Sequence, residues 1–181
     1  PPPDALRDAW TRAFVDVMGR LADALAPRPL NEQRSWFHLH EASFHVARAE
    51  AERLGLDQDF AALTQSLAAY AQNTRDFKAA EAWYRKSLAI KEKQGDEHGA
   101  ASTYHQLGRI AGLREQYEES GEWLIKAVVA FRRQRDAALT KQSVQTFMVL
   151  YHRATPAQQA KLRERWDQAG LGTFPEDPGP G

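Results

Sequence analysis

Apolar residues recur at intervals of three or four positions along almost the whole chain. Near its start, Leu6, Trp10, Phe14, Val17 and Leu21 follow this spacing, which places them on one face of an α-helix. No segment alternates apolar and polar residues as a half-buried strand does. The pattern predicts an all-α protein, helical from about residue 5 to about residue 170. It also predicts that this first apolar face, Trp10 included, packs into the core.

Proline, glycine and short polar residues mark where the helices begin and end. We expect helix-capping residues at Asn31, Asp57, Asp76, Asp96, Asp136 and Thr155. Pro27 and Pro29 end the first helix, and Gly55, Gly95 and Gly170 stop later ones. After the first, the expected helices are 31–54, 57–73, 76–94, 97–113, 116–134, 137–153 and 156–169. Because the connections are short, eight such helices pair into four antiparallel hairpins.

One segment of the chain is repeated. Residues 76–90 are echoed forty positions later by residues 116–130, with Trp123 in the place of Trp83 and Tyr117 in the place of Phe77. An echo at fixed spacing is typical of proteins built by stacking similar helical units. The function of such a stack lies in the surface that it presents.

The repeated residues resemble the tetratricopeptide repeat. The small and large residues that carry this resemblance are Leu67, Ala68, Ala71, Phe77, Ala80, Tyr84 and Ser87, followed by Leu107, Gly108, Ala111, Tyr117, Ser120, Leu124 and Ala127. The resemblance implies a solenoid of helix hairpins in which Ala80 and Ser120 are buried where two helices cross closely. The forty-residue period is similar to the longer-helix repeats of bacterial signalling proteins, where such arrays adjoin ATPase or protease modules.

This resemblance suggests a division of the chain. Residues 57–134 form two repeats, after a divergent or capping N-terminal hairpin at 1–56. Residues 135–170 form a third, repeat-like or capping hairpin, and 171–181 form a disordered tail or linker. Because both ends are rich in proline, we expect the chain to be a piece of a larger protein.

Composition narrows the classes of partner. Lys plus Arg and Asp plus Glu each number 24, so no global positive charge favours nucleic acid as a partner. The chain has no cysteine, which excludes disulfides and thiolate chemistry. It lacks an apolar run long enough for a bilayer and a recognisable leader peptide. We therefore expect a soluble, cytoplasmic protein without a membrane partner.

The sequence offers no clear site for catalysis or a metal. His38, Glu41 and His45 share a helix face, but the zinc-protease pattern needs two histidines four apart, and His40 and His45 are five apart. A hydrogen-bonding surface explains these side chains better than a ligand set. No phosphate-binding glycine loop or nucleophile elbow is present. We predict no metal, no cofactor and no enzymatic activity.

The resemblance implies where a partner would bind. In the family, the first helix of each repeat lines a concave groove, and the residues that this places there are Gln65, Gln72, His105, Arg109, Gln145 and His152, with Ala69, Gly112 and Val149 on the same faces. The Lys and Asn set with which one chaperone-binding subclass clamps a C-terminal carboxylate is missing. Arg109 with His105 could still meet one acidic group. Ordinary solvated side chains are the alternative interpretation.

These observations favour a non-catalytic protein-interaction module that binds a peptide or helix through a concave groove. The partner is another protein or a further segment of the same chain, and a homo-oligomer is also compatible with the sequence. The alternative is a regulatory or oligomerisation segment of a multidomain signalling enzyme or transcription regulator.

Overall fold

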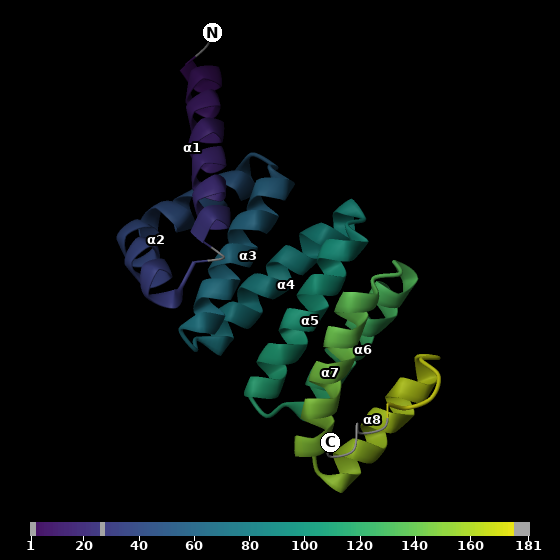
Figure 1. The fold of residues 1–181 in the computed structure, drawn as a ribbon. Coiled ribbons are helices and arrows are strands. Elements are labelled where there is room, and N and C mark those ends of the chain that lie inside the picture. Colours follow the sequence, from purple (N-terminus) through teal and green to yellow (C-terminus); the bar gives the residue numbers. More distant parts are fainter. Residues whose placement is uncertain (1–2, 26–27, 176–181) are drawn as a thin grey trace. The chain divides into compact units, whose positions relative to one another are not determined.

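The computed structural model describes residues 3–25 and 28–175, which fold into α-helices without a strand (Figure 1). Its helices are α1 (Pro3–Leu25), α2 (Leu30–Arg53), α3 (Asp57–Asn73), α4 (Phe77–Gln94), α5 (Glu97–Leu113), α6 (Tyr117–Arg133), α7 (Ala137–Arg153) and α8 (Pro156–Gln168). The predicted all-α, hairpin-built fold is confirmed. No helix within these described residues is both long and apolar enough to cross a membrane.

Most predicted helix starts are confirmed by their capping bonds. The carboxylates of Asp76, Asp96 and Asp136 each accept a hydrogen bond from the main-chain amide three residues later, at 2.9–3.0 Å. At α8, Gln158 N donates to Thr155 Oγ1 (3.4 Å) while Thr155 N donates to Gln158 Oε1 (3.0 Å). This reciprocal capping box satisfies two amides that would otherwise lack partners.

Two predicted caps are wrong by one or two residues. Asn31 lies inside the first turn of α2, which already begins at Leu30 after Pro29. Asp57 is the first residue of α3 rather than its cap, and its carboxylate pairs with Lys93 Nζ at 2.8 Å. Gly55 has a φ of 64°, and Leu56 rather than Asp57 occupies the cap position of α3. Pro27 lies outside the described residues.

The helix connections repeat every twenty residues. Gly55, Arg75, Gly95, Glu115 and Arg135 all have positive φ, between 58° and 70°. At four of these turns, the amide of the following residue donates to the carbonyl five residues before it, at 2.8–3.0 Å. This is the left-handed helix ending that favours glycine, yet three of the five positions are not glycine.

Contacts divide the chain into two compact units, which we describe separately: an N-terminal unit up to Gln94 and a C-terminal unit from Gly95. The core of the N-terminal unit is built from α1 to α4. Phe37 is a buried member of this core and stacks on Tyr70, with ring centroids 4.3 Å apart. Trp83 is partly buried and packs against this core.

The prediction that the first apolar face of α1 enters the core holds for Phe14 and Leu21, which are partly buried and pack against it, but is wrong for Trp10. Trp10 is 72% exposed, and Leu6 and Val17 are also exposed. The helix also packs through Val15 and Met18. Because α1 is apolar on two faces, the spacing alone does not decide which face is buried.

In the C-terminal unit, α7 and α8 close over a core that contains Phe147 and Trp166. The chain after α8 returns to this core. Leu171 is buried and its carbonyl accepts a hydrogen bond from Arg132 (2.6 Å), while Phe174 packs on both core aromatics. Residues 171–175 therefore belong to the packed unit, and 176–181 lie outside the described residues.

The two predicted helix crossings are confirmed. Ala80 and Ser120 are both fully buried. At the α5–α6 crossing, a Cβ on Gly108 would lie 2.6 Å from Leu124 Cγ and 3.2 Å from the carbonyl oxygen of Ser120. Only a residue without a side chain fits at Gly108, because the helices approach so closely.

Candidate functional site

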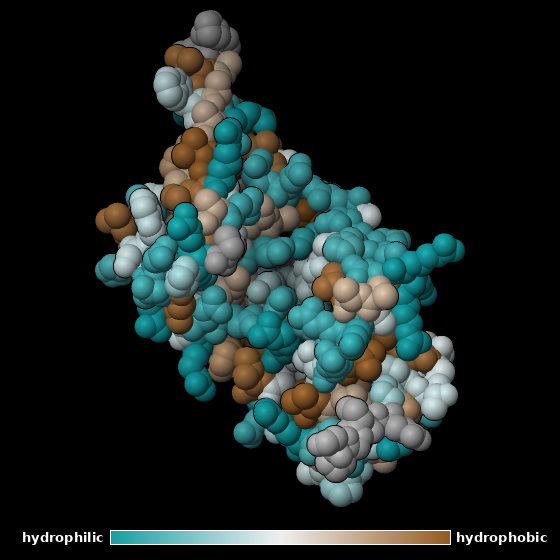
Figure 2. Space-filling view, in the orientation of Figure 1, coloured by the Kyte–Doolittle hydropathy of each residue, from teal (hydrophilic) through white to brown (hydrophobic). Residues whose placement is uncertain are grey.

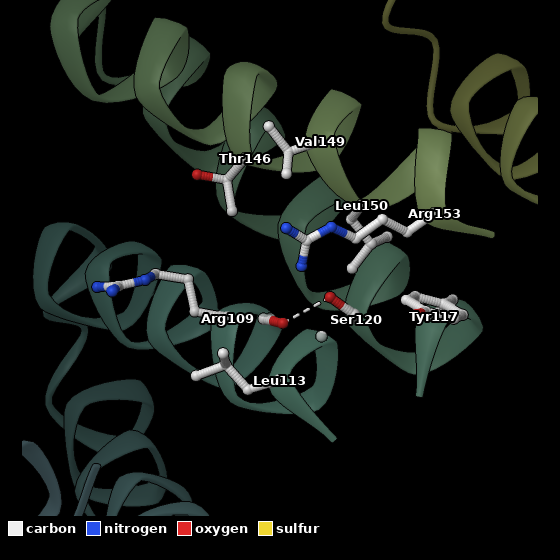
Figure 3. A pocket seen from close by; sticks show the side chains of 10 residues that line it. Arg109, Leu113, Tyr117, Ser120, Thr146, Val149, Leu150 and Arg153 are labelled. Carbon is white, nitrogen blue, oxygen red and sulfur yellow. Dashed lines mark hydrogen bonds between the residues drawn. The ribbon is translucent and has the colours of Figure 1, made fainter. Parts of the chain in front are cut away.

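The C-terminal unit contains a pocket between α5 and α7, with α6 beneath it (Figure 3). Its walls are formed by Arg109 and Leu113 from α5 and by Thr146, Val149, Leu150 and Arg153 from α7. Tyr117 and Ser120 from α6 complete the lining. Three consecutive helices of the repeat thus contribute to one site.

Glycine makes the pocket hollow. Gly108 and Gly112 form the α5 side of its floor. A Cβ at Gly112 would lie 2.9 Å from Leu150 Cδ1 and 3.2 Å from Ser120 Oγ. A larger residue there would push against α6 and α7 and fill the space, so the depression depends on these two positions.

The rim combines positive charge with exposed apolar surface. Leu113 and Val149 are 52% and 56% exposed, and Arg109 and Arg153 are exposed beside them. Figure 3 shows the Arg153 guanidinium turned over Leu150 toward the space between the helices. No acidic side chain lines the pocket. Such a rim can hold an apolar side chain and a neighbouring carboxylate together.

The size of the pocket suits one side chain. Its volume is about 160 Å³, below the roughly 300–1,000 Å³ of sites that enclose a small molecule. The pocket is also open to solvent rather than enclosed (Figure 3). Its shape therefore favours one anchoring residue of a larger partner over a free cofactor or metabolite.

His105 lies behind this rim and is buried. Its Nδ1 is 3.0 Å from Ser143 Oγ, which ties α5 to α7. Burial, together with the smaller effect of the nearby Arg109 guanidinium, lowers the pKa of His105 to about 4. At neutral pH the imidazole is therefore uncharged, and the positive charge of the rim comes from arginine alone.

The other sequence candidates lie away from the pocket. Gln145 and His152 are exposed on α7 but do not line it. Gln65 and Gln72 belong to α3 of the N-terminal unit, where Gln65 accepts a hydrogen bond from the buried Lys91. Of the six predicted groove residues, Arg109 is the one that lines the pocket.

Several pocket residues were missed. Thr146 and Arg153 line the pocket, one residue after the predicted Gln145 and His152, and so do Val149 and Gly112, which the sequence placed on the predicted faces. Because Ser143 and Phe147 are buried, they fix the rotation of α7 about its axis and so determine which of its residues face the pocket. Arg153 was visible in the sequence as a cationic residue four positions after Val149, but it was not predicted as a site residue.

Two of the three histidines of α2 make aromatic contacts. His45 lies 5.8 Å from the ring of Trp83, and His40 stacks on Trp36 with centroids 5.4 Å apart. No three or more His, Cys, Asp or Glu side chains gather around a potential metal position in the residues that the structure describes. The absence of a metal remains a prediction.

Comparison with known proteins supports the resemblance that the sequence suggested. A family model described as tetratricopeptide repeat matches residues 59–139, which run from the first turn of α3 to the first turn of α7 and include the α5 and α6 sides of the pocket. A comparison with curated proteins found no match. Repeats of this family generally mediate protein–protein interactions and are not catalytic. Residues 59–139 of the chain therefore belong to the tetratricopeptide repeat family.

Proposed function

We propose that the chain is a non-catalytic module that binds a peptide or helix of another protein, or of its own longer chain, through the surface formed by α5 and α7. The observation that carries this proposal is the glycine-floored pocket flanked by Arg109 and Arg153 and by exposed Leu113 and Val149. In this proposal the two repeats at 57–134 are held between end hairpins at 1–56 and 135–170.

The chemistry of the rim suggests what the partner presents. An aliphatic or aromatic side chain enters between Leu113 and Val149, where it buries apolar area. A carboxylate next to it along the partner meets Arg109 or Arg153, neither of which forms an ion pair with another described residue. Guanidinium groups bind carboxylates through paired N–H donors. Gln145 and His152 are candidates for outer contacts, and Gln65 and Gln72 for contacts on α3.

A peptide library tests this proposal. Random peptides displayed on phage are selected on the parent protein and counter-selected on an Arg109→Ala, Arg153→Ala double variant. We expect the enriched peptides to combine an acidic residue with a large apolar neighbour. The double variant should bind them at least tenfold more weakly, since loss of a central interface arginine typically costs about 2 kcal/mol or more.

Arg133→Ala is the matched control, because Arg133 is also exposed in the C-terminal unit and lies outside the pocket. Its binding should equal that of the parent. Enriched peptides without acidic residues, or equal losses from Arg133→Ala and from the double variant, would contradict the proposal.

The alternative function, an oligomerisation segment of a larger protein, is favoured by a different observation. Large apolar side chains are exposed along α1 of the N-terminal unit, far from any pocket residue in sequence.

A further inference from the structure

Three contacts hold α5 beside α7, and each joins a residue of α5 to the residue 38 positions later. They are His98 Nε2 to Asp136 Oδ2 (3.4 Å), His105 Nδ1 to Ser143 Oγ (3.0 Å), and a Cβ placed on Gly112 to Leu150 Cδ1 (2.9 Å). On each helix the contacts follow one another at intervals of seven residues, or about two turns. The two helices are therefore parallel and keep one register along their length.

This register determines how the two arginines of the pocket lie along the groove between α5 and α7. Arg109 is level with position 147 of α7, six residues before Arg153. At 1.5 Å per residue, the two arginine backbones are offset by about 9 Å along the helix axes. Leu113 and Val149 lie between these two levels, and in Figure 2 hydrophobic surface on α7 is bordered by hydrophilic surface. The groove therefore presents positive charge, an apolar hollow and positive charge in succession.

The pocket offers few groups that could hold the main chain of an extended peptide. Ser120 Oγ already donates to the Gly108 carbonyl, and Thr146 Oγ1 donates to the Gln142 carbonyl at 3.0 Å. The described residues that line the pocket include no Asn or Gln, whose side-chain amides can pair with both polar groups of a peptide bond. An extended segment would bury main-chain groups here without partners, whereas a helix satisfies its own.

This inference rests on the proposed function and specifies the partner. We propose that the partner segment is an amphipathic α-helix that lies along the groove between α5 and α7. A large apolar residue of this helix enters the pocket. One acidic residue on the turn before it and one on the turn after it, seven positions apart, meet Arg109 and Arg153.

The spacing of the two acidic residues follows from helix geometry. Seven residues of an α-helix rise about 10.5 Å and return to within about 20° of the same face. This rise exceeds the offset of the two arginine backbones by about 1.5 Å, which two long side chains accommodate. Neither Arg109 nor Arg153 forms an ion pair with another described residue, so both guanidinium groups can bind a carboxylate.

A designed peptide tests this pattern. The probe is a fluorescein-labelled, alanine-rich helix of about twenty residues, with two glutamates seven positions apart and a leucine four positions after the first. We expect it to bind at least tenfold more tightly than two matched peptides. In one of these, the second glutamate lies five positions after the first and so on the far side of the helix. In the other, a proline between the first glutamate and the leucine breaks the helix.

Charge exchange tests which residues meet. Arg109→Glu should weaken binding of the probe at least tenfold, and lysine in place of one of its two glutamates should restore it. Arg153→Glu should be rescued only by lysine at the other position, so the pair of rescues also establishes the direction of the partner helix. Arg133→Glu is the control, because Arg133 is exposed outside the pocket, and it should bind the probe like the parent. Rescue of both pocket variants by the same lysine would overturn the proposed register.

The helical partner and the proposed function fail in different ways. If peptides selected from the library need both arginines but keep their affinity when proline interrupts them, the helical partner is wrong and the binding surface stands. If neither arginine affects the binding of any selected peptide, the proposed function is wrong as well. Melting curves of each variant accompany the titrations, since these exposed substitutions should leave the fold intact.

Discussion

The hydroxyl of Ser120 donates a hydrogen bond of 2.5 Å to the main-chain carbonyl of Gly108, where α5 and α6 cross. The same hydroxyl lies beneath Gly112, whose Cβ, if present, would approach it to 3.2 Å. One serine thus lies both at the close crossing of α5 and α6 and at the floor of the candidate binding pocket. The helix crossing that defines the repeat and the floor of the pocket therefore depend on the same serine hydroxyl.

Gly108→Ala should destabilise the protein by about 1–3 kcal/mol, because the added methyl group overpacks the crossing against Leu124. Chemical denaturation measures this loss. Gly19→Ala is the control, since Gly19 is also a buried helical glycine but its added Cβ would meet nothing closer than 3.9 Å. There the greater helix propensity of alanine should leave stability unchanged or higher by up to about 1 kcal/mol. Equal effects of both substitutions would contradict the close crossing.

Ala80→Leu should cost a similar amount, about 1–3 kcal/mol, at the equivalent crossing of α3 and α4. Ala80 is fully buried, whereas Ala82 on the same helix is exposed. Ala82→Leu is therefore expected to change stability by less than about 0.5 kcal/mol. An Ala80→Leu variant that melts like the parent would refute the equivalence of the two crossings.

Stability should fall as the pH drops from about 6.5 to about 4, because burial lowers the pKa of His105 to about 4. In that window the unfolded chain takes up a proton that the folded chain does not, so acid favours unfolding. Above about pH 6.5 both states are uncharged at this residue, and the effect vanishes. We expect a contribution of up to about 2 kcal/mol, less than the full pKa change implies because solvent screens part of it.

The measurement compares denaturation of the parent and of His105→Gln at pH 7 and pH 4.5. His105→Gln removes the titrating group, so its stability should depend less on pH than that of the parent. Parallel pH profiles for the two proteins would show that another group is responsible.

Glu115→Gly should stabilise the protein by about 0.5–1 kcal/mol. Glu115 has a φ of 60°, a left-handed conformation that glycine adopts without steric cost. The reverse change at the equivalent turn, Gly95→Ala, should destabilise by about 1 kcal/mol, since Gly95 has a φ of 70° and an added Cβ would meet no other atom within 4 Å. Thermal melting distinguishes the two signs. A loss of stability at Glu115→Gly would mean that its turn is not strained.

The regular part of the fold could be predicted because local chemistry determines it. The caps at Asp96 and Asp136 act through bonds to amides three residues later, and the spacing that they need is visible in the sequence. Gly95 likewise indicates a helix that ends in the left-handed conformation, which favours glycine. Arg75 and Glu115 occupy the same conformation without a residue type that reveals it, so the twenty-residue recurrence of turns was not recognised.

Burial could not be predicted where two faces of one helix are apolar. Trp10 and Met18 lie on different faces of α1, and only tertiary packing decides that Met18 is buried and Trp10 is not. The phase of α7 was missed for a related reason. The contact of Ser143 with His105 and the burial of Phe147 rotate Arg153, rather than His152, toward the pocket.

The central claim is that the surface of α5 and α7 binds the partner. It is tested most directly by recording amide spectra of the ¹⁵N-labelled chain while an enriched peptide is added. The account predicts that the amides of Arg109, Leu113, Thr146, Val149 and Arg153 shift first and saturate together, and that Arg153→Ala abolishes these shifts. Shifts confined to α8 or to the N-terminal unit, with the α5 and α7 amides unmoved, would contradict it.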